Sequence, residues 1–312
     1  MQWDDRIGRR LRLKDLHTLQ TVAEAGSMAK ASEQLALSQP AISKAISDME
    51  HTLGAPLLDR SSRGVELTEC GRLLVGRGRV IFDEVRQGIL DIEHLSDASR
   101  GEVRIGTSEP VSVLVSQIIC RLAREYPRIT YRVMVSDSDT LARALRERAL
   151  DVLLTRWIPP LVADDLAAEV LYKAPLAVMA NKSHPLVHRS RLKLVDLMEE
   201  QWTLPPPESL LGRMVADVFR RRRLALPTAV VSTNSNYMQL NLLASGRFVS
   251  VLRSTFLRHR ANSTWLRALS VDLTDSSGPI ASITVRKRRS AGAVKLFQAM
   301  SRAVSKEFAD LR

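Results

Sequence analysis

A set of polar side chains lies on one face of a helix that the sequence predicts between residues 38 and 53. Amide, hydroxyl and ammonium groups of this size fit into the major groove of DNA, where they bond base edges and phosphates. A glutamine can also pair with adenine through two hydrogen bonds. For an isolated helix the simpler interpretation is a solvated polar face. The residues concerned are Gln39, Pro40, Ser43, Lys44 and Ser47.

The opposite face of this helix is apolar and predicts packing against helices that precede it. The predicted packed residues are Ala41, Ile42, Ala45, Ile46, Met49 and Leu53. Upstream, apolar residues recur at helical spacing from Leu16, and Gly26 ends that helix. Ser27 can cap a second helix, and Ser38 can cap the third. A helix, a short polar turn and another helix form the pattern of a helix-turn-helix.

The segment after Gly54 predicts two further elements. Extended residues at 57–60 and 65–67 flank a loop with Gly64, which indicates either a hairpin or an irregular loop. Thr68 can then cap a long helix to about residue 95, whose apolar positions alternate in steps of four and three. Such a stripe is typical of a helix that pairs with another helix, and packing on its own domain is the alternative. The stripe residues are Leu74, Ile81, Val85, Ile92 and Leu95, with Gly78 and Gly88 at the two missing positions.

Beyond Gly101, strand patterns alternate with helix patterns. This alternation predicts α/β layers with a largely parallel sheet. The expected strands cover residues 103–106, 129–135, 151–155, 176–179, 228–232, 248–252 and 280–285. The expected helices cover residues 110–126, 141–148, 210–223, 237–244 and 291–309.

The composition limits the class of protein. The chain has 312 residues, a length typical of two or three domains, and 45% of them are hydrophobic. It has no apolar run long enough to span a membrane and no apolar signal-peptide core, so we expect a cytoplasmic protein. Two cysteines are too few for a disulfide framework or a zinc site. Because the motifs of hydrolases, phosphate-binding loops and dinucleotide-binding folds are absent, we expect neither an enzyme nor a cofactor.

The formal net charge of +12 suggests an anionic partner, but its distribution does not point to the helical N-terminal part. Residues 1–100 contain 14 Lys and Arg against 15 Asp and Glu, whereas residues 101–312 contain 32 against 19. The case for DNA binding therefore depends on the helix-turn-helix pattern. The arginines of the N-terminal arm can touch the DNA backbone or be solvated; they are Arg6, Arg9, Arg10 and Arg12.

The N-terminal pattern resembles the LysR-type transcriptional regulator family at fixed spacing. The matching segments are Leu16, residues 26–35, residues 38–46, Met49-Glu50, Leu53-Gly54, residues 57–60, Leu67-Thr68 and Gly71. The resemblance implies an α/β multidomain protein with an N-terminal winged helix-turn-helix, a long linker helix and a C-terminal two-lobed effector domain similar to periplasmic binding proteins. The implied limits are residues 1–68, 69–98 and 99–312, with lobe I at about 99–171 and 275–312 and lobe II at about 172–274.

Residue by residue, the resemblance implies two sets of DNA contacts. The helix-turn-helix contacts are Ser27, Gln39, Pro40, Ser43, Lys44 and Ser47. Arg60 and Arg63 belong to the wing, where an arginine can enter a narrowed minor groove or hold a phosphate. The implied partners are a pseudo-palindromic site on double-stranded DNA, a second copy or three further copies of the chain, and RNA polymerase if the protein is an activator.

The resemblance also implies a small effector held between the two lobes, near the carboxyl ends of strands. The candidate residues are Thr107, Ser108, Glu109, Ser136, Asp137, Ser138, Thr155, Arg156, Trp157, Pro206, Ser232 and Asn234. Arg156 offers a guanidinium for an anion, and Trp157 offers an indole face for a ring or a sugar. The alternative is an arginine paired with a surface carboxylate and a tryptophan that fills a gap. The mixture of groups favours a sugar or a hydroxylated organic acid.

Two other functions fit the same architecture. A small-molecule-binding protein would explain the α/β lobes, although the N-terminal helices argue against a secreted one. A redox sensor would need reactive thiols. Cys70 opens the long helix and Cys120 lies in an apolar helix, so we expect both to be buried and inert.

Overall fold

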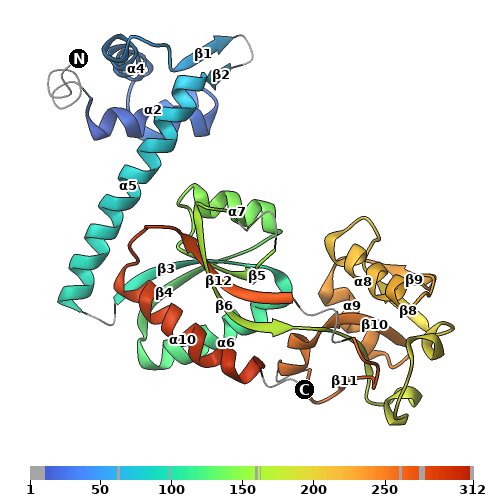
Figure 1. The fold of residues 1–312 in the computed structure, drawn as a ribbon. Coiled ribbons are helices and arrows are strands. Elements are labelled where there is room, and N and C mark those ends of the chain that lie inside the picture. The colour runs from blue at the N-terminus through green and yellow to red at the C-terminus, as the bar shows by residue number, and fades with distance from the viewer. Residues whose placement is uncertain are drawn as a thin grey trace. The chain divides into compact units, whose positions relative to one another are not determined.

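The computed structural model describes residues 11–61, 64–97, 100–158, 161, 163–259, 262–273 and 278–309 (Figure 1). The chain divides into two compact units, Met1–Ile89 and Leu90–Arg312. The long helix α5, Glu69–Ser96, contributes residues to both units. Within the described ranges, no helix is both long and apolar enough to cross a membrane.

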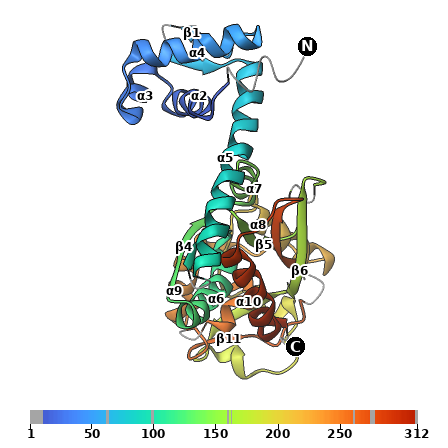
Figure 2. The ribbon, with the colours of Figure 1, turned by 90° about the vertical axis from the view of Figure 1, so that its left-hand side faces the viewer.

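The first unit contains three short helices and a hairpin ahead of α5 (Figure 2). They are α2 (Leu13–Ala25), α3 (Met28–Leu35), α4 (Gln39–Leu53), β1 (Leu58–Ser61) and β2 (Gly64–Leu67). Their apolar faces meet in one core, which includes Leu19, Val22, Ile42, Ile46 and Met49. The three predicted helices are therefore confirmed, and the segment after Gly54 forms the hairpin rather than an irregular loop.

One residue of the predicted packed face of α4 is placed differently. Ala41 is exposed, although Ile42 beside it is fully buried. Successive residues of a helix point about 100° apart, so a position directly before a core residue can face away from the core.

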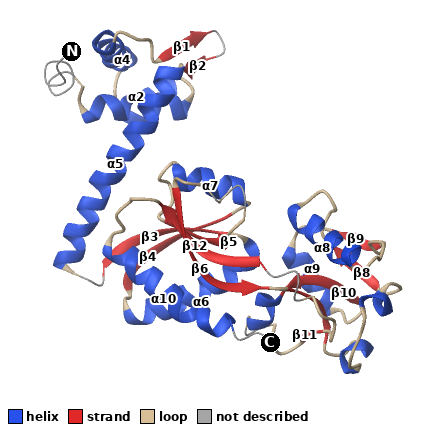
Figure 3. Ribbon diagram, viewed as in Figure 1, coloured by secondary structure: helices blue, strands red, loops and turns tan. Residues whose placement is uncertain are grey.

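The second unit begins with a mixed five-stranded sheet in the order β4-β3-β5-β12-β6. Its strands are β3 (Arg100–Thr107), β4 (Arg128–Val135), β5 (Val152–Arg156), β6 (Leu166–Ala174) and β12 (Gly278–Val285). The helices α6 (Ser112–Glu125) and α10 (Gly292–Ala309) pack against each other, and α10 also packs on β3 and β6. The helix α7 (Ser138–Arg146) packs on β3, β5 and β12, and Figure 3 shows it across the sheet from α6 and α10.

A second mixed five-stranded sheet follows, in the order β11-β7-β10-β8-β9. Its strands are β7 (Leu176–Asn181), β8 (Gln201–Leu204), β9 (Ala229–Ser232), β10 (Phe248–Arg253) and β11 (Leu266–Ala268). Its longer helices are α8 (Leu210–Arg221) and α9 (Asn236–Ala244). The core of this lobe contains Trp202, whose ring meets Phe219 edge-on at a centroid distance of 5.7 Å.

The prediction of a largely parallel sheet is correct for only part of each lobe. In the first sheet β3 pairs parallel with β4 and β5, but β12 pairs antiparallel with β5 and β6. The chain enters the second lobe between Ala174 and Leu176, and β12 returns from it. Because β12 arrives from another sheet and not through a crossover helix, nothing requires it to run parallel to its neighbours.

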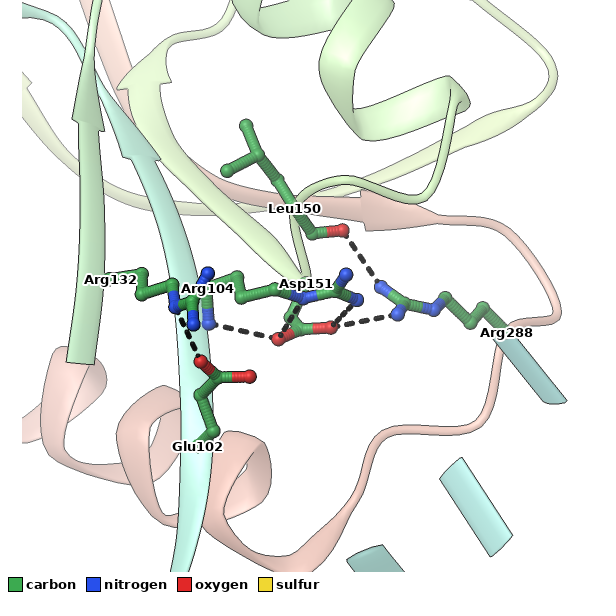
Figure 4. A network of polar contacts seen from close by, with 6 residues as sticks. All are labelled: Glu102, Arg104, Arg132, Leu150, Asp151 and Arg288. Atoms are coloured by element: carbon green, nitrogen blue, oxygen red, sulfur yellow. Dashed lines mark hydrogen bonds and ion pairs between the residues drawn. The ribbon is translucent and has the colours of Figure 1, made fainter. Parts of the chain in front are cut away.

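A buried carboxylate joins three segments of the first lobe (Figure 4). Asp151 precedes β5 and accepts hydrogen bonds from the backbone N–H of Arg104 at 2.9 Å and from its Nη2 at 2.8 Å. Arg288, which follows β12, donates to the same carboxylate at 2.7 Å and to the carbonyl oxygen of Leu150 at 3.0 Å. The Asp151 carboxylate therefore links β3, β5 and the segment after β12 to one another.

The two cysteines are both exposed, which corrects the expectation that they are buried. Cys120 lies on α6 between Ile118 and Leu122, which are buried on the other side of that helix. Cys70 lies in the first turn of α5, beside the buried Gly71.

Candidate functional site

The amino-terminal half of α4 presents the polar residues predicted for DNA contact. Ser38 caps the helix by accepting a hydrogen bond from the backbone N–H of Ala41 at 3.4 Å, and Pro40 lies in the first turn, where no N–H is needed. Four of the predicted residues are exposed, namely Gln39, Pro40, Lys44 and Ser47. Ser43 is half-buried and has a polar contact. The arrangement leaves an amide, a hydroxyl and an ammonium group open to a ligand.

The turn between α2 and α3 contains Ser27 and is hydrogen-bonded to the hairpin. Ser27 is half-buried and caps α3 by accepting a hydrogen bond from the Lys30 N–H at 3.2 Å. The Val65 N–H donates to the carbonyl oxygen of Gly26 at 3.2 Å, which ties β2 to this turn. Gly64 has a φ of +127°, and a Cβ there would lie 2.9 Å from the same carbonyl oxygen. A glycine therefore permits the close approach of the hairpin to the turn.

The hairpin is anchored to α4 as well. Glu50 accepts hydrogen bonds from the backbone N–H groups of Leu57 at 2.7 Å and Leu58 at 3.3 Å, just where β1 begins. In the hairpin register Arg60 lies opposite Val65, but its side chain is outside the described part of the structure. Arg63 also lies outside the described residues.

Of the arginines in the N-terminal arm, only Arg12 is among the described residues. Its guanidinium forms an ion pair with Asp15 at 2.9 Å on the first turn of α2. The hydrogen bond to Asp15 raises the pKa of Arg12.

The carboxyl ends of β3, β4 and β5 lie side by side, because these strands are neighbours in the sheet and run parallel. Thr107 is buried and donates to the carbonyl oxygen of Leu154 at 2.8 Å. The hydroxyl of Thr155 donates to that of Ser108 at 3.2 Å. Glu109 follows in the 3₁₀ helix η1 (Glu109–Val111) and is half-buried. The structure thus brings Thr107, Ser108 and Thr155 together.

The three residues predicted after β4 lie at the start of the helix α7. Asp137 is the cap itself and accepts hydrogen bonds from the N–H groups of Asp139 at 3.0 Å and Thr140 at 2.9 Å. The bond from Thr140 is the main reason that the pKa of Asp137 is lowered. Ser136 donates to the same carboxylate at 3.3 Å, and Ser138 is the first residue of the helix. This carboxylate is therefore already occupied by bonds within the protein.

Arg156 and Trp157 end β5 and lie in different surroundings. Trp157 is half-buried against an apolar cluster, and its backbone N–H donates to the carbonyl oxygen of Pro279 at 2.9 Å. Arg156 is half-buried too, and burial lowers the pKa of its guanidinium. Its Nε has no hydrogen-bond partner in the part of the chain that the structure describes.

The second lobe contributes Pro206 after β8, and Ser232 and Asn234 at the end of the neighbouring strand β9 and just beyond it. Pro206 is half-buried, and its carbonyl oxygen accepts a hydrogen bond from the hydroxyl of Ser209 at 2.7 Å. Ser232 and Asn234 are exposed.

Sequence reasoning missed one residue at the junction of the two lobes. Arg253 is the last residue of β10 and is only 2% exposed. The signal that pointed to Arg156, a charged residue directly after an expected strand, also applies to Arg253, since the expected strand covers residues 248–252. The lobes meet here, since the hydroxyl of Thr255 donates to the carbonyl oxygen of Pro110 at 3.1 Å. For a metal ion, the described residues offer no cluster of three His, Cys, Asp or Glu side chains.

Two family models match the chain. The model described as "Bacterial regulatory helix-turn-helix protein, lysR family" matches residues 13–72, and "LysR substrate binding domain" matches residues 96–306. The HTH-type transcriptional regulator GbpR of Azospirillum brasilense is 30% identical over 244 residues, which are 78% of this chain and 71% of that protein. GbpR of Rhizobium radiobacter is 31% identical over 241 residues, which are 75% of this chain and 78% of that protein.

Solved structures show the same fold. A full-length OxyR variant from Pseudomonas aeruginosa superposes with a TM-score of 0.67 at 19% identity, covering 95% of this chain and 97% of that one. CbnR, a LysR family transcriptional regulator, superposes with a TM-score of 0.55 at 21% identity, covering 94% of this chain and 100% of that one. With both domains matched in their order along the chain, the protein belongs to the LysR family of DNA-binding transcriptional regulators, which carry an effector-binding domain and are not enzymes.

Proposed function

We propose that the protein recognises a pseudo-palindromic promoter site through α4 and the hairpin, and that a small effector bound in the second unit switches its activity. The exposed polar first turns of α4, backed by the buried Ile42 and Ile46, carry this proposal. In this scheme residues 1–68 read DNA, residues 69–98 link and pair two subunits, and residues 99–312 bind the effector. If the protein is an activator, RNA polymerase is its further partner.

The effector site of this scheme lies where the strand ends of the two lobes meet. Ser108, Thr155 and Arg156 support it from the first lobe, since their side chains lie at adjacent strand ends. Hydroxyl and guanidinium groups suit a hydroxylated ligand, either a sugar or an organic acid. Genome-wide mapping of bound DNA would identify the operator and, through the neighbouring genes, the class of effector.

Base recognition is expected to depend on Gln39 and general affinity on Lys44. Gln39→Ala should remove about 1–3 kcal/mol of discrimination between the operator and a scrambled sequence, because base-edge bonds carry the specificity. Lys44→Ala should weaken binding to both DNAs and reduce the slope of log K against log salt by about 1, because one phosphate contact is lost. Binding titrations over a salt series measure both effects.

Lys14→Ala is the control, since Lys14 is exposed on α2 and lies outside the predicted contact set. It should leave the preference for the operator unchanged. An equal loss of affinity for both DNAs in Gln39→Ala would contradict this division of roles.

Subunit pairing is expected to use the apolar stripe of α5. Within this single chain Ile81, Val85, Ile92 and Leu95 are 41–87% exposed. Such a row of apolar side chains is stabilised when a second helix covers it. Val85→Glu combined with Ile92→Glu should therefore convert the oligomer to monomers and abolish high-affinity operator binding.

Light scattering coupled to size exclusion measures the change in mass. Arg77→Glu is the matched control, because it adds a glutamate at an exposed position of the same helix outside the stripe. A variant of the stripe that kept the oligomeric mass of the wild type would rule out α5 as the pairing element.

A further inference from the structure

Two arginines from different lobes meet beside a glycine. Arg156 is the last residue of β5, Arg253 is the last residue of β10, and Gly278 is the first residue of β12. A Cβ built on Gly278 would lie 3.8 Å from Nε of Arg156 and 4.0 Å from Nη1 of Arg253. Both guanidinium groups therefore reach the same point in the junction between the lobes.

The charges of this pair are not balanced by the side chains that the structure describes. Arg253 donates from Nη1 to the carbonyl oxygen of Ala174 at 3.0 Å and from Nη2 to the sulfur of Met214 at 3.7 Å, both neutral groups. No carboxylate of the described residues forms an ion pair with either arginine. Burial, together with the charge of Arg156, lowers the pKa of Arg253 to about 9. Buried charges without a partner destabilise a folded protein, so an anion placed here would be bound favourably.

Neutral polar groups and a residue without a side chain complete the surroundings. The hydroxyls of Tyr172 and Ser254 are buried and lack hydrogen-bond partners within the described ranges. Tyr172 lies on β6, where burial raises the pKa of its hydroxyl and the nearby charge of Arg253 opposes that rise, and Ser254 follows Arg253 directly. Because Gly278 has no side chain, no methyl group lies beside the two guanidinium groups, although one would fit there at ordinary contact distances.

We propose that the effector carries an anionic group, a carboxylate or a phosphate, that binds between Arg156 and Arg253 next to Gly278. The proposal rests on the proposed function, namely that the second unit binds a small effector. It selects the hydroxylated acid over the neutral sugar, since a sugar would leave both charges without a partner. A planar guanidinium binds the oxygens of either group in pairs, so both chemistries satisfy the site.

The position of the arginine pair also means that an anion bound there contacts both lobes. Arg156 belongs to the first sheet and Arg253 to the second. An anion held by both is sensitive to the distance between the strand ends, so it stabilises the arrangement in which both arginines reach it.

The first test needs no ligand. In an anion-poor zwitterionic buffer, Arg156→Gln of the full-length protein removes one of two like charges and should raise Tm by about 2–4 °C. Arg143→Gln is the matched control, because Arg143 is an exposed arginine of the same lobe, and its Tm should stay at the wild-type value. A lower Tm for Arg156→Gln would show that Arg156 is held by a partner within the protein and would overturn the proposal.

A carboxylate close to Gly278 in the sequence is tested as a candidate counter-ion of the arginine pair in the same way. Asp275 lies three residues before Gly278 and is outside the described residues. Asp275→Asn should leave Tm unchanged in the same buffer. If it instead lowered Tm in the wild type but not in Arg156→Gln, Asp275 would be the counter-ion of the pair and no effector anion would be needed.

The second test adds anions at constant ionic strength. Malate and inorganic phosphate are compared with glycerol, with sodium chloride as the ionic control. We expect malate or phosphate, but neither glycerol nor chloride, to raise the wild-type Tm by several degrees with a saturable dose dependence. The larger shift of the two identifies carboxylate or phosphate as the preferred group. The gain should disappear in Arg156→Gln, and also in Gly278→Ala, whose added methyl group lies beside both guanidinium groups and leaves the arginines themselves intact.

The outcomes separate the proposal from the function on which it rests. An equal gain in wild type and Arg156→Gln, or no gain from either anion, would overturn the anion site. Stabilisation by galactose instead of malate would also overturn it, while the effector-binding function would stand. Operator binding by the same variants, measured in parallel, tests the DNA-binding unit independently of the ligand.

Discussion

Asp151→Asn is expected to lower the free energy of unfolding of the second unit by about 3–5 kcal/mol, because it removes the carboxylate charge that faces the buried guanidinium of Arg288. Arg288 is 4% exposed in its side chain and Arg104 is 18% exposed, so water cannot replace the lost carboxylate at Arg288. The amide of asparagine keeps the size of the group but not its charge. Chemical denaturation followed by the fluorescence of Trp157, Trp202 and Trp265 measures the loss, and Figure 4 shows the contacts that are removed.

The control for Asp151→Asn is an exposed ion pair that is also drawn in Figure 4. Arg132 pairs with Glu102 at 2.7 Å, but its side chain is 80% exposed. Arg132→Gln should cost no more than about 1 kcal/mol, since solvent screens an exposed ion pair. If the two variants unfolded at the same denaturant concentration, the buried position of Asp151 would not matter and the prediction would fail.

Gly71→Ala is expected to displace the start of α5 from the hairpin and to weaken DNA binding. A Cβ at this position would lie 2.1 Å from the carbonyl oxygen of Leu57 and 2.9 Å from Cδ2 of Leu67. The Leu57 carbonyl oxygen also accepts the N–H of Thr68 at 3.0 Å, so it cannot move without losing that bond. The first unit should lose about 1–3 kcal/mol of stability, as overpacked cores do.

Thermal melting and operator titration of the same sample give the stability and the affinity of Gly71→Ala. Gly76→Ala is its matched control, because Gly76 is exposed on α5 and a Cβ there meets nothing within 4 Å. It should stabilise the helix by up to about 1 kcal/mol and leave operator affinity unchanged. Wild-type stability and affinity in Gly71→Ala would show that the contact with Leu57 is not required.

Local signals in the sequence predicted the helices of the first unit well. Ser27 and Ser38 act at short range, through bonds to residues three positions away, so their capping role follows from neighbouring residues alone. The rule that ligands bind at strand ends placed Ser108 and Thr155 together for a similar reason, since it needs only the order of parallel strands.

The parts that sequence reasoning missed depend on contacts between distant segments. The neighbours of Arg253 come from β5, β6 and β12, and their approach requires the chain to cross twice between the lobes. The antiparallel direction of β12 has the same origin. Exposure of Ala41 and Cys120 depends on which side of a helix meets the core, which a spacing pattern locates only to within one residue.

The place of β12 in the first sheet determines when that lobe can be completed on the ribosome. β12 lies between β5 and β6, so β6 cannot join the rest of the sheet until Gly278–Val285 has left the exit tunnel. All the strands of the second sheet, from β7 to β11, are synthesised before that point. The lobe in the middle of the chain can therefore fold first during translation, while β3, β4 and β5 wait for the last part of the polypeptide, a reversal of the usual order from the amino terminus.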